Sequence, residues 1–196
     1  DTSPTDDIET LRKAAEQGDA DAQTDLGMRC YTGDGVPKDY AEAAKWVRKA
    51  AEQGHAWSQF NLGSMYDLGI GIPEDKAQAV KWYRKAAEQG DAEAQNNLGL
   101  KYQNGEGVPQ DYAQAVKWYR KAAEQGDALP QYFLGRMYAA GEGVPEDAAE
   151  AVKWYRKAAE QGNVRAQHSL GTMYANGRGV AEDDTEVVTW YRKAAE

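Results

Sequence analysis

The sequence predicts an all-α repeat protein in which every repeat contributes two helices. The phrase AVKWYRKAAEQG occurs unchanged three times, and successive copies are offset by 36 residues. A fixed period of this length is typical of solenoids, in which each repeat contacts only its neighbours. Apolar residues recur at helical spacing, and no segment shows the alternation of a strand. The unchanged copies lie at residues 79–90, 115–126 and 151–162, the near-copies at 43–54 and 187–196, and a degraded copy at 7–18.

Glycines at one repeated position divide the chain into five repeats and a half-repeat. We expect a single solenoid domain over residues 7–196, because each repeat must bury its apolar face against the next one. The half-repeat at 7–18 keeps Leu11 apolar but has Thr10 at the tryptophan position, which suits a capping helix. A polar, acidic stretch in front, residues 1–6, is expected to be a flexible tail. The full repeats are 19–54, 55–90, 91–126, 127–162 and 163–196.

Each repeat contains start and stop signals for both helices. In the third repeat, Asp91 can cap the first helix, which must end near Gly105 because a Gly-Glu-Gly-Val-Pro turn begins there. The second helix opens with the Asp-x-x-Glu/Gln form of a capping box and closes at a glycine that can take positive φ. Pro130 lies in the first turn of its helix, where we expect the missing N–H to do no harm. The capping pairs are Asp39/Glu42, Asp75/Gln78, Asp111/Gln114, Asp147/Glu150 and Asp183/Glu186, and the closing glycines are Gly18, Gly54, Gly90, Gly126 and Gly162.

Small and aromatic residues indicate how the two helices of a repeat pack. We expect Gly99 of the first helix to lie against Ala115 of the second, since small residues let two backbones approach closely. Leu98, Tyr102 and Tyr119 would then fill the space between neighbouring helix pairs. Because these positions recur in every repeat, they belong to the scaffold.

Composition excludes several classes of function. The net charge is −9, from 32 acidic and 23 basic residues, which argues against the basic stripe that nucleic-acid binding requires. No apolar run approaches the roughly 20 residues that span a bilayer, so no direct membrane insertion is expected. Cys30 is the only cysteine, so an intrachain disulfide is impossible. It stands where the other repeats have tyrosine, and we expect a buried, inert thiol.

No pattern in the sequence indicates a catalytic, metal or cofactor site. His55 and His168 lack metal-ligand spacing with an acid or a thiol, and both are expected at the surface. The repeated Gly-x-Gly turns follow a helix, whereas a phosphate loop follows a strand and opens a helix. No Ser/His/Asp arrangement can be singled out. We therefore predict a protein that is not an enzyme and that needs no cofactor.

The repeats resemble Sel1-like repeats (SLR), which are relatives of the tetratricopeptide repeat with a longer turn between the two helices. The resemblance rests on the pattern A-x-A-Q-x-x-L-G-x-x-Y-x-x-G-x-G-V-P-x-D followed by A-V-K-W-Y-R-K-A-A-E-Q-G, and it covers residues 7–196. It implies a right-handed α-solenoid superhelix of antiparallel helix pairs, a bacterial source, and a role as an adaptor that holds other proteins. A periplasmic or secreted location is expected rather than a cytoplasmic one. The cysteine-rich subfamily, with its proposed penicillin-binding activity, does not match because its cysteines are missing here.

Residues that depart from the repeat mark the expected partner surface. Tyr31, Trp57, Phe60 and Tyr132 are aromatic residues at positions where the repeated pattern has none. In tetratricopeptide-like proteins the first helix of each pair lines the concave face, and the resemblance places these four residues there. Exposed apolar patches typically mark interaction sites, and Trp and Tyr are favoured anchors. The predicted partner-binding residues are Met28, Tyr31, Trp57, Phe60, Ser64, Asp67, Leu68, Glu93, Asn96, Leu100, Gln103, Leu129, Tyr132, Arg136, Arg165 and His168.

Three functions are compared. The favoured hypothesis is a non-catalytic scaffold that binds a peptide or protein segment on the concave face. The alternative is a structural array that self-associates, because Trp190 and Tyr191 in the last helix would have no following repeat to cover them. Either the array continues, or this end packs against another molecule, as in a homo-oligomer. The third is an envelope enzyme acting on cell-wall material, for which no residue pattern argues.

Overall fold

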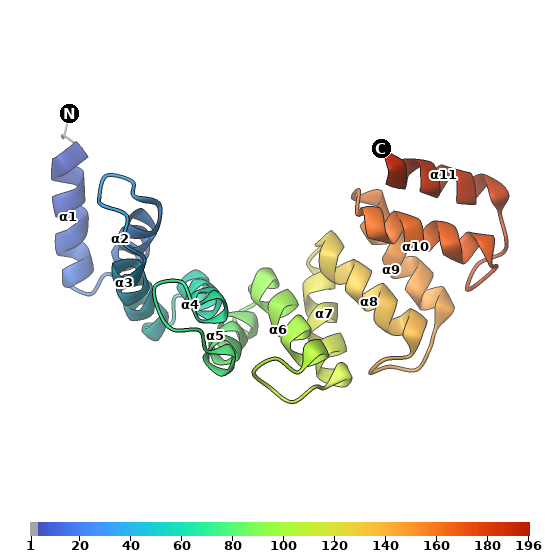
Figure 1. Ribbon diagram of the computed structural model, residues 1–196, viewed down its shortest axis with the longest axis horizontal. Helices are drawn as coiled ribbons and strands as arrows, with labels where there is room; N and C mark the ends of the chain where they lie inside the picture. Colours follow the sequence, from blue (N-terminus) through green and yellow to red (C-terminus); the bar gives the residue numbers. More distant parts are fainter. Residues whose placement is uncertain (1–3) are drawn as a thin grey trace. The chain divides into compact units, whose positions relative to one another are not determined.

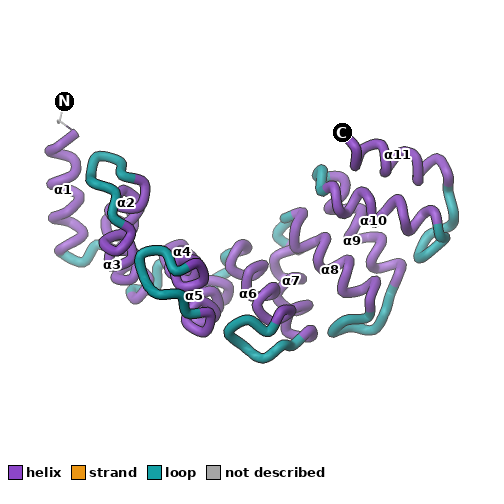
Figure 2. The backbone as a smooth tube through the Cα atoms, in the orientation of Figure 1, coloured by secondary structure: helices purple, strands orange, loops and turns teal. Residues whose placement is uncertain are grey.

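The structure is a computed structural model that describes residues 4–196, and Figure 1 shows its helices in chain order. Within these residues there are eleven helices and no strand. In Figure 2 the described part of the chain is coloured as helix and loop alone. None of these helices is both long enough and apolar enough to cross a lipid bilayer. The helices are α1 (Pro4–Glu16), α2 (Ala20–Thr32), α3 (Tyr40–Glu52), α4 (Ala56–Leu68), α5 (Lys76–Glu88), α6 (Ala92–Asn104), α7 (Tyr112–Glu124), α8 (Ala128–Ala140), α9 (Ala148–Glu160), α10 (Val164–Ala175) and α11 (Asp184–Ala195).

Consecutive helices form the antiparallel pairs that the sequence predicts. Each 36-residue repeat contributes a first and a second helix, beginning with α2 and α3 and ending with α10 and α11. The all-α solenoid fold is therefore confirmed. Glycines with positive φ, between +85° and +113°, follow the second helices as expected. Gly105, with φ of +72°, ends α6 where the turn signal places the helix end.

The helices group into two compact units, which we describe one at a time. The N-terminal unit comprises the residues up to Ala94 together with Glu106–Val108. The C-terminal unit comprises Gln95–Gly105 and Pro109–Glu196. The expectation of one domain over residues 7–196 stays a prediction.

The front of the chain is more helical than expected. Helix α1 begins at Pro4, within the segment 1–6 that the sequence predicts to be a tail, while residues 1–3 lie outside the described residues. Leu11 packs against the buried cluster of the N-terminal unit, and Thr10 is exposed. Helix α1 thus has the polar outer face that a capping helix needs.

The predicted capping boxes form only in part. The carboxylate of Asp39 accepts hydrogen bonds from the backbone N–H groups of Ala41 and Glu42, at 2.9 and 3.0 Å. The N–H of Asp39, however, donates to the carbonyl oxygen of Cys30 at 2.8 Å, because the loop folds back onto the preceding helix. The Glu42 carboxylate instead pairs with Lys45 at 3.0 Å. The N-caps are confirmed, and the expected reciprocal bond from the third residue is wrong.

The start of α8 also differs from the expectation. In the other four first helices, the side chain of the N-cap accepts the backbone N–H of the third helical residue, as Asp91 accepts that of Ala94 at 2.7 Å. In α8 this third residue is Pro130, which has no N–H, and Asp127 makes no side-chain cap hydrogen bond. The expectation that the proline does no harm is wrong, because it removes the donor that the cap uses elsewhere.

A glycine on each first helix admits a side chain from the second helix of the same repeat. A Cβ atom at Gly99 would lie 2.7 Å from Cδ1 of Tyr119, whose ring is fully buried. The same relation holds for Gly63 and Gly135 with the tyrosines of their own repeats. The atoms nearest to Gly99 thus belong to the ring of Tyr119, and the approach of Gly99 to Ala115 stays a prediction.

Buried glutamine side chains fix the register between consecutive repeats. In the N-terminal unit, the amide of Gln59 donates to the carbonyl oxygen of Ala51 in the preceding repeat at 3.1 Å. Its Oε1 accepts from Gln89 of its own repeat at 2.8 Å. Gln131 and Gln161 repeat this arrangement in the C-terminal unit. The same pair of glutamines therefore makes the same two hydrogen bonds in both units.

The last helix is better covered than the sequence predicts. Trp190 is 6% exposed and belongs to a buried cluster with Met173 and Tyr174. Its indole N–H donates to Oε2 of Glu186 at 2.7 Å. The expectation of an uncovered tryptophan is therefore wrong, because Trp190 packs within its own repeat. Tyr191 remains 37% exposed.

Candidate functional site

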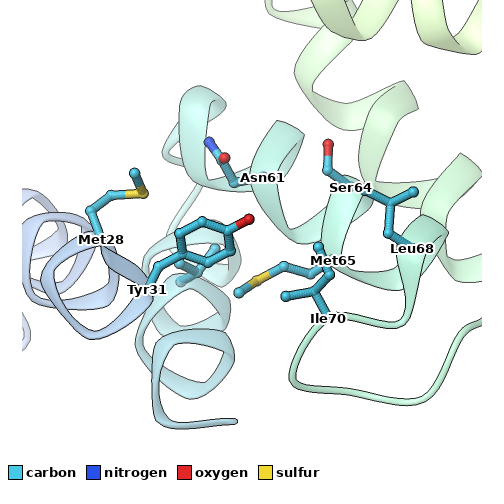
Figure 3. A pocket seen from close by; sticks show the side chains of 8 residues that line it. Met28, Tyr31, Asn61, Ser64, Met65, Leu68 and Ile70 are labelled. Carbon is cyan, nitrogen blue, oxygen red and sulfur yellow. The ribbon is translucent and has the colours of Figure 1, made fainter. Parts of the chain in front are cut away.

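An apolar pocket opens on the N-terminal unit, beside the first helices of the first two repeats. Figure 3 shows Met28 and Tyr31 of α2 facing Asn61, Ser64 and Leu68 of α4. The pocket has a volume of about 150 Å³. Its lining consists of Met28, Tyr31, Val47, Asn61, Ser64, Met65, Leu68 and Ile70.

The second repeat shows how the space beside the repeated glycine is normally filled. There the ring of Tyr83 lies over Gly63, so that a Cβ at the glycine would be 2.7 Å from the ring. The hydroxyl of Tyr83 donates to Oγ of Ser64 at 3.2 Å and lies 3.5 Å from Oδ2 of Asp67. One phenol thus fills the space and ties the second helix to two side chains of the first.

The first repeat has a smaller residue at this position. Val47 stands where the next three repeats have a buried tyrosine, and it contacts Gly27, whose Cβ would lie 2.9 Å from Cγ2 of the valine. Met28 and Tyr31 occupy the positions of Ser64 and Asp67. Because valine carries no ring, the space that the phenol fills in the second repeat is left open. The pocket follows from this substitution.

A second tyrosine of the repeat is also missing here. Cys30 takes its place and is 3% exposed, as expected, and burial raises the pKa of its thiol. Tyr31, one residue further on, packs against Tyr40 with ring centroids 5.0 Å apart. Its ring therefore forms a wall of the pocket, as Figure 3 shows.

Helix α4 adds two exposed apolar side chains to the face beside the pocket, with two polar residues between them. Trp57, Asn61, Ser64 and Leu68 follow at intervals of four, three and four residues, which places them on one face of the helix. Trp57 is 39% exposed and Leu68 is 66% exposed. Large apolar side chains at this exposure lose contact with water only when a partner covers them. Phe60 is half-buried and lies 5.9 Å from the ring of Tyr83.

Asp67, one of the predicted partner-binding residues, has a side chain that is only 16% exposed. Nζ of Lys76 lies 3.1 Å from its Oδ1 and also bonds its backbone oxygen. Hydrogen bonding to Asp67 raises the pKa of Lys76. The Asp67 carboxylate thus stabilises the turn between α4 and α5.

The predicted residues of the C-terminal unit lie on α6, α8 and α10. Leu129 is 44% exposed, and Arg136, Arg165 and His168 are also exposed. Tyr132 is half-buried, with its ring 5.6 Å from Phe133 and 6.0 Å from Tyr155. In this repeat the ring of Tyr155 lies over Gly135, at the position that Val47 has in the first repeat.

Helix α6 carries the remaining four predicted residues. Glu93 is exposed and falls in the N-terminal unit, whereas Asn96, Leu100 and Gln103 are half-buried and fall in the C-terminal unit. Gln103 accepts a hydrogen bond from the hydroxyl of Tyr119 at 2.7 Å. The predicted set is thus divided between the two units, and a continuous concave face stays a prediction.

A serine, a histidine and an aspartate come together between α2 and α4, an arrangement that the sequence does not predict. Nδ1 of His55 lies 3.0 Å from Oγ of Ser58, and its Nε2 lies 3.5 Å from Oδ1 of Asp21. Ser58 is 0% exposed, so no substrate can reach its hydroxyl. Nδ1 of His55 also accepts the backbone N–H of Ser58 at 3.2 Å, and the Ser58 hydroxyl lies 2.7 Å from that of Thr24. The cluster caps α4 and joins it to α2.

Comparison with known proteins identifies the repeat. Six segments of the chain match the model of the Sel1 repeat, namely residues 11–19, 20–55, 58–91, 92–127, 131–163 and 164–196. The chain belongs to the Sel1 repeat family. No curated protein matches its sequence.

Two solved Sel1 repeat structures are similar over almost the whole chain. The protective antigen c5321 of uropathogenic Escherichia coli, which has an SLR fold, is 44% identical over 98% of this chain, with a TM-score of 0.94. The present chain spans 41% of that protein. A Sel1 repeat protein from Oxalobacter formigenes is 38% identical over 97% of this chain and 84% of its own, with a TM-score of 0.88. The immunity protein PA5088 of Pseudomonas aeruginosa, 22% identical over 96% of this chain and 72% of its own with a TM-score of 0.57, shares the fold.

Four lining residues of the pocket in this Sel1 repeat protein were not predicted: Val47, Asn61, Met65 and Ile70. Two of these four residues can be recognised in the sequence as departures from the repeat. Val47 interrupts the repeated phrase, and Ile70 is apolar where the other repeats have a charged residue in the turn. A search for lost scaffold tyrosines, and not only for added aromatic residues, would have found the pocket. Within the described residues, no group of three or more His, Cys, Asp or Glu side chains could hold a metal ion.

Proposed function

We propose that this Sel1 repeat protein is a non-catalytic scaffold that binds a segment of another protein on the first-helix surface of its N-terminal unit. The supporting observation is the open apolar pocket flanked by two exposed side chains, Trp57 and Leu68. An apolar groove with a few polar groups is the usual form of a recognition surface. The Ser58 cluster offers no accessible nucleophile, which favours binding over catalysis.

The expected affinity is modest. Burying Trp57, Leu68 and one side chain in the pocket contributes roughly 1.5–3 kcal/mol for each apolar group. Association costs about 4–15 kcal/mol in lost freedom, so hydrogen bonds must supply part of the difference. At the favourable ends of these ranges the three apolar groups leave about 5 kcal/mol, which corresponds to a dissociation constant of about 0.2 mM, so micromolar binding needs about 3 kcal/mol more from hydrogen bonds.

Charge indicates the kind of segment that fits. Residues 1–94 carry 18 acidic and 11 basic side chains, whereas residues 95–196 carry 14 and 12. The acidic excess therefore falls on the half of the chain that holds the pocket. On the first-helix surface, the Asp21 side chain is 92% exposed. A partner segment with basic residues is favoured, because complementary charge steers association.

The proposed setting is the bacterial periplasm or the cell exterior. The Escherichia coli relative is a protective antigen of uropathogenic strains, and a location in the envelope or outside the cell exposes an antigen to host antibodies. We propose the same kind of location for this chain, with a partner in the envelope or outside the cell.

Self-association is a second candidate, carried by α11. Val188 is 55% exposed and Tyr191 is 37% exposed, one helical turn apart. If this surface joins two copies, light scattering across a dilution series shows a mass that rises with concentration. A monomer mass at every concentration rules this candidate out.

The test compares partner capture by wild-type and variant protein. Trp57→Ala is expected to lower recovery of a specifically captured envelope protein by about tenfold, since buried aromatic anchors are typical hot spots. Val164→Ala, at a residue 56% exposed on α10 and outside the predicted set, serves as the matched control. Circular dichroism confirms the fold of both variants. Equal recovery by wild type and Trp57→Ala would show that the partner binds elsewhere.

A further inference from the structure

We propose that the pocket beside Val47 receives a tyrosine side chain of the bound segment, next to a basic residue of that segment. This inference rests on the proposed function and specifies its chemistry. The partner's phenol takes the place that the missing tyrosine of repeat 1 leaves open. The geometry of Tyr83 over Gly63 shows what a ring does in the equivalent space of the next repeat.

The pocket has the size of one aromatic ring. Its volume is about 150 Å³. Apolar cavities of about 150 Å³ lined by aliphatic and aromatic side chains stay dry and bind benzene. Met28 and Met65 contribute thioethers to the wall, and sulfur–aromatic contacts are favourable. The pocket therefore suits a planar ring better than a long aliphatic chain.

Polar groups at the pocket favour a phenol over a plain ring. The amide nitrogen of Asn61 donates to the carbonyl oxygen of Trp57 at 2.7 Å, which leaves its side-chain oxygen as an acceptor. Ser64 donates to the carbonyl oxygen of Phe60 at 3.2 Å and accepts from Tyr83, so its oxygen keeps one further lone pair. Figure 3 shows Asn61 and Ser64 on α4, across from Tyr31. A phenolic O–H can donate to either of them.

Charge complementarity accounts for the basic neighbour. Asp21 lies on α2 two helical turns before Met28, and its side chain is 92% exposed. The one arginine of α2, Arg29, is paired with Asp25 at 3.2 Å. A lysine or arginine near the inserted tyrosine therefore meets an exposed carboxylate on α2. Such a rim contact adds association rate and specificity more than affinity.

The four methionines of the chain make a direct test possible. Protein labelled with ¹³C in the methionine methyl groups gives one signal each for Met28, Met65, Met137 and Met173. Titration with 4-methylphenol, the side chain of tyrosine, is expected to shift the Met28 and Met65 signals saturably. The signals of Met137 and Met173, which are buried in the C-terminal unit, stay in place. Toluene, which lacks the hydroxyl, is expected to bind several-fold more weakly.

Val47→Tyr supplies the ring from within the chain. It restores the residue found at this position in the other four repeats, so the fold is expected to survive with an unchanged or higher Tm. The 4-methylphenol shifts at Met28 and Met65 should then vanish. If Val47→Tyr does not fold, Val47→Phe fills the same space without a hydroxyl. Shifts that persist in a folded filled variant, or an absence of shifts in the wild type, overturn the proposal.

Partner capture separates this inference from the proposed function. If Val47→Tyr and Trp57→Ala both lose the captured protein, both proposals are supported. If Trp57→Ala loses it and Val47→Tyr keeps it, the scaffold stands and the tyrosine pocket is wrong. If both variants keep it, the first-helix surface of the N-terminal unit is not the binding site, and both proposals are overturned.

Discussion

Repeats 1 and 4 have the same pattern of helices, but different side chains lie beside the repeated glycine of the first helix. In repeat 4 the ring of Tyr155 lies over Gly135 and is 4% exposed. In repeat 1 Val47 lies over Gly27, and a pocket opens next to it. The difference shows that a solenoid can gain a surface pocket through loss of a scaffold ring. No new loop or helix is needed.

A second difference lies in how the aromatic residues outside the scaffold are used. In repeat 4 Tyr132 packs against Tyr155, so an aromatic residue that departs from the repeat completes the core. In repeat 2 Trp57 remains 39% exposed and has no such ring to cover it among the described contacts. The same sequence signal therefore has two structural outcomes. Which one occurs depends on the position along the first helix. Phe60, which corresponds to Tyr132, lies 5.9 Å from the ring of Tyr83, whereas Trp57 lies one helical turn earlier.

The largest expected effect concerns the scaffold tyrosine. Tyr119→Ala should destabilise the protein by about 3–5 kcal/mol, because it leaves a cavity at a fully buried site. Val47→Ala, at the same position of repeat 1, should cost about 1.5 kcal/mol for two lost methyl groups. Urea unfolding followed by circular dichroism measures both. Tyr191→Ala is the control for an exposed ring at this position, and equal losses at positions 47 and 119 would contradict the comparison.

High pH tests the buried phenols of the C-terminal unit. Burial raises the pKa of Tyr155 to about 12, and it raises the pKa of Tyr119 as well. An unfolded tyrosine ionises near pH 10, so the folded state holds its proton more tightly. The stability from these groups is complete below pH 10 and is lost as pH rises from 10 to about 12, by at most about 3 kcal/mol for Tyr155.

The measurement is the free energy of unfolding as a function of pH in that range. Tyr155→Phe removes the ionisable group and should flatten the decline relative to its own value at neutral pH. Repeat 1 makes no such contribution at this position, because valine does not titrate. A decline that is equally steep in Tyr155→Phe would assign it to other groups.

The sequence predicts the scaffold well because the scaffold repeats. The helix ends near Gly105 and the N-caps such as Asp39 follow from local backbone chemistry, and the structure confirms them. The contact between Gly99 and the ring of Tyr119 does not follow from the sequence, because periodicity gives the face of a residue but not its partner. The sequence also does not show that Trp190 is buried by side chains of its own repeat, because that packing depends on how α10 and α11 lie against each other.

The site could be predicted only in part. Tyr31, Trp57 and Leu68 were identified as departures from the repeat, and the structure places Tyr31 and Leu68 in the pocket wall. The pocket itself exists because Val47 has no aromatic ring. The residues that would pack against such a ring do not reveal its absence in their own sequence. The turn residue Ile70 also lines the pocket, together with residues of α2 far from it in the sequence, and such proximity is a tertiary property.

The smallest expected effect compares the caps of two first helices. Asp91→Ala should destabilise the protein by about 1 kcal/mol, because Asp91 accepts the N–H of Ala94 at 2.7 Å. Asp127→Ala should cost only about 0.3–0.5 kcal/mol, the interaction of a carboxylate with the helix dipole. Asp127 makes no side-chain cap hydrogen bond, because Pro130 lacks the donor.

A double-mutant cycle sharpens this last comparison. Pro130→Ala restores a backbone N–H at the third position of α8, so Asp127 gains a donor and its replacement becomes more costly. In the Pro130→Ala background, Asp127→Ala should therefore cost about 1 kcal/mol, close to the value at Asp91. The measured quantity is the coupling free energy between positions 127 and 130. The separate cost of deleting the proline ring cancels in this cycle. A coupling of zero would mean that the missing N–H is not what distinguishes α8 from the other first helices.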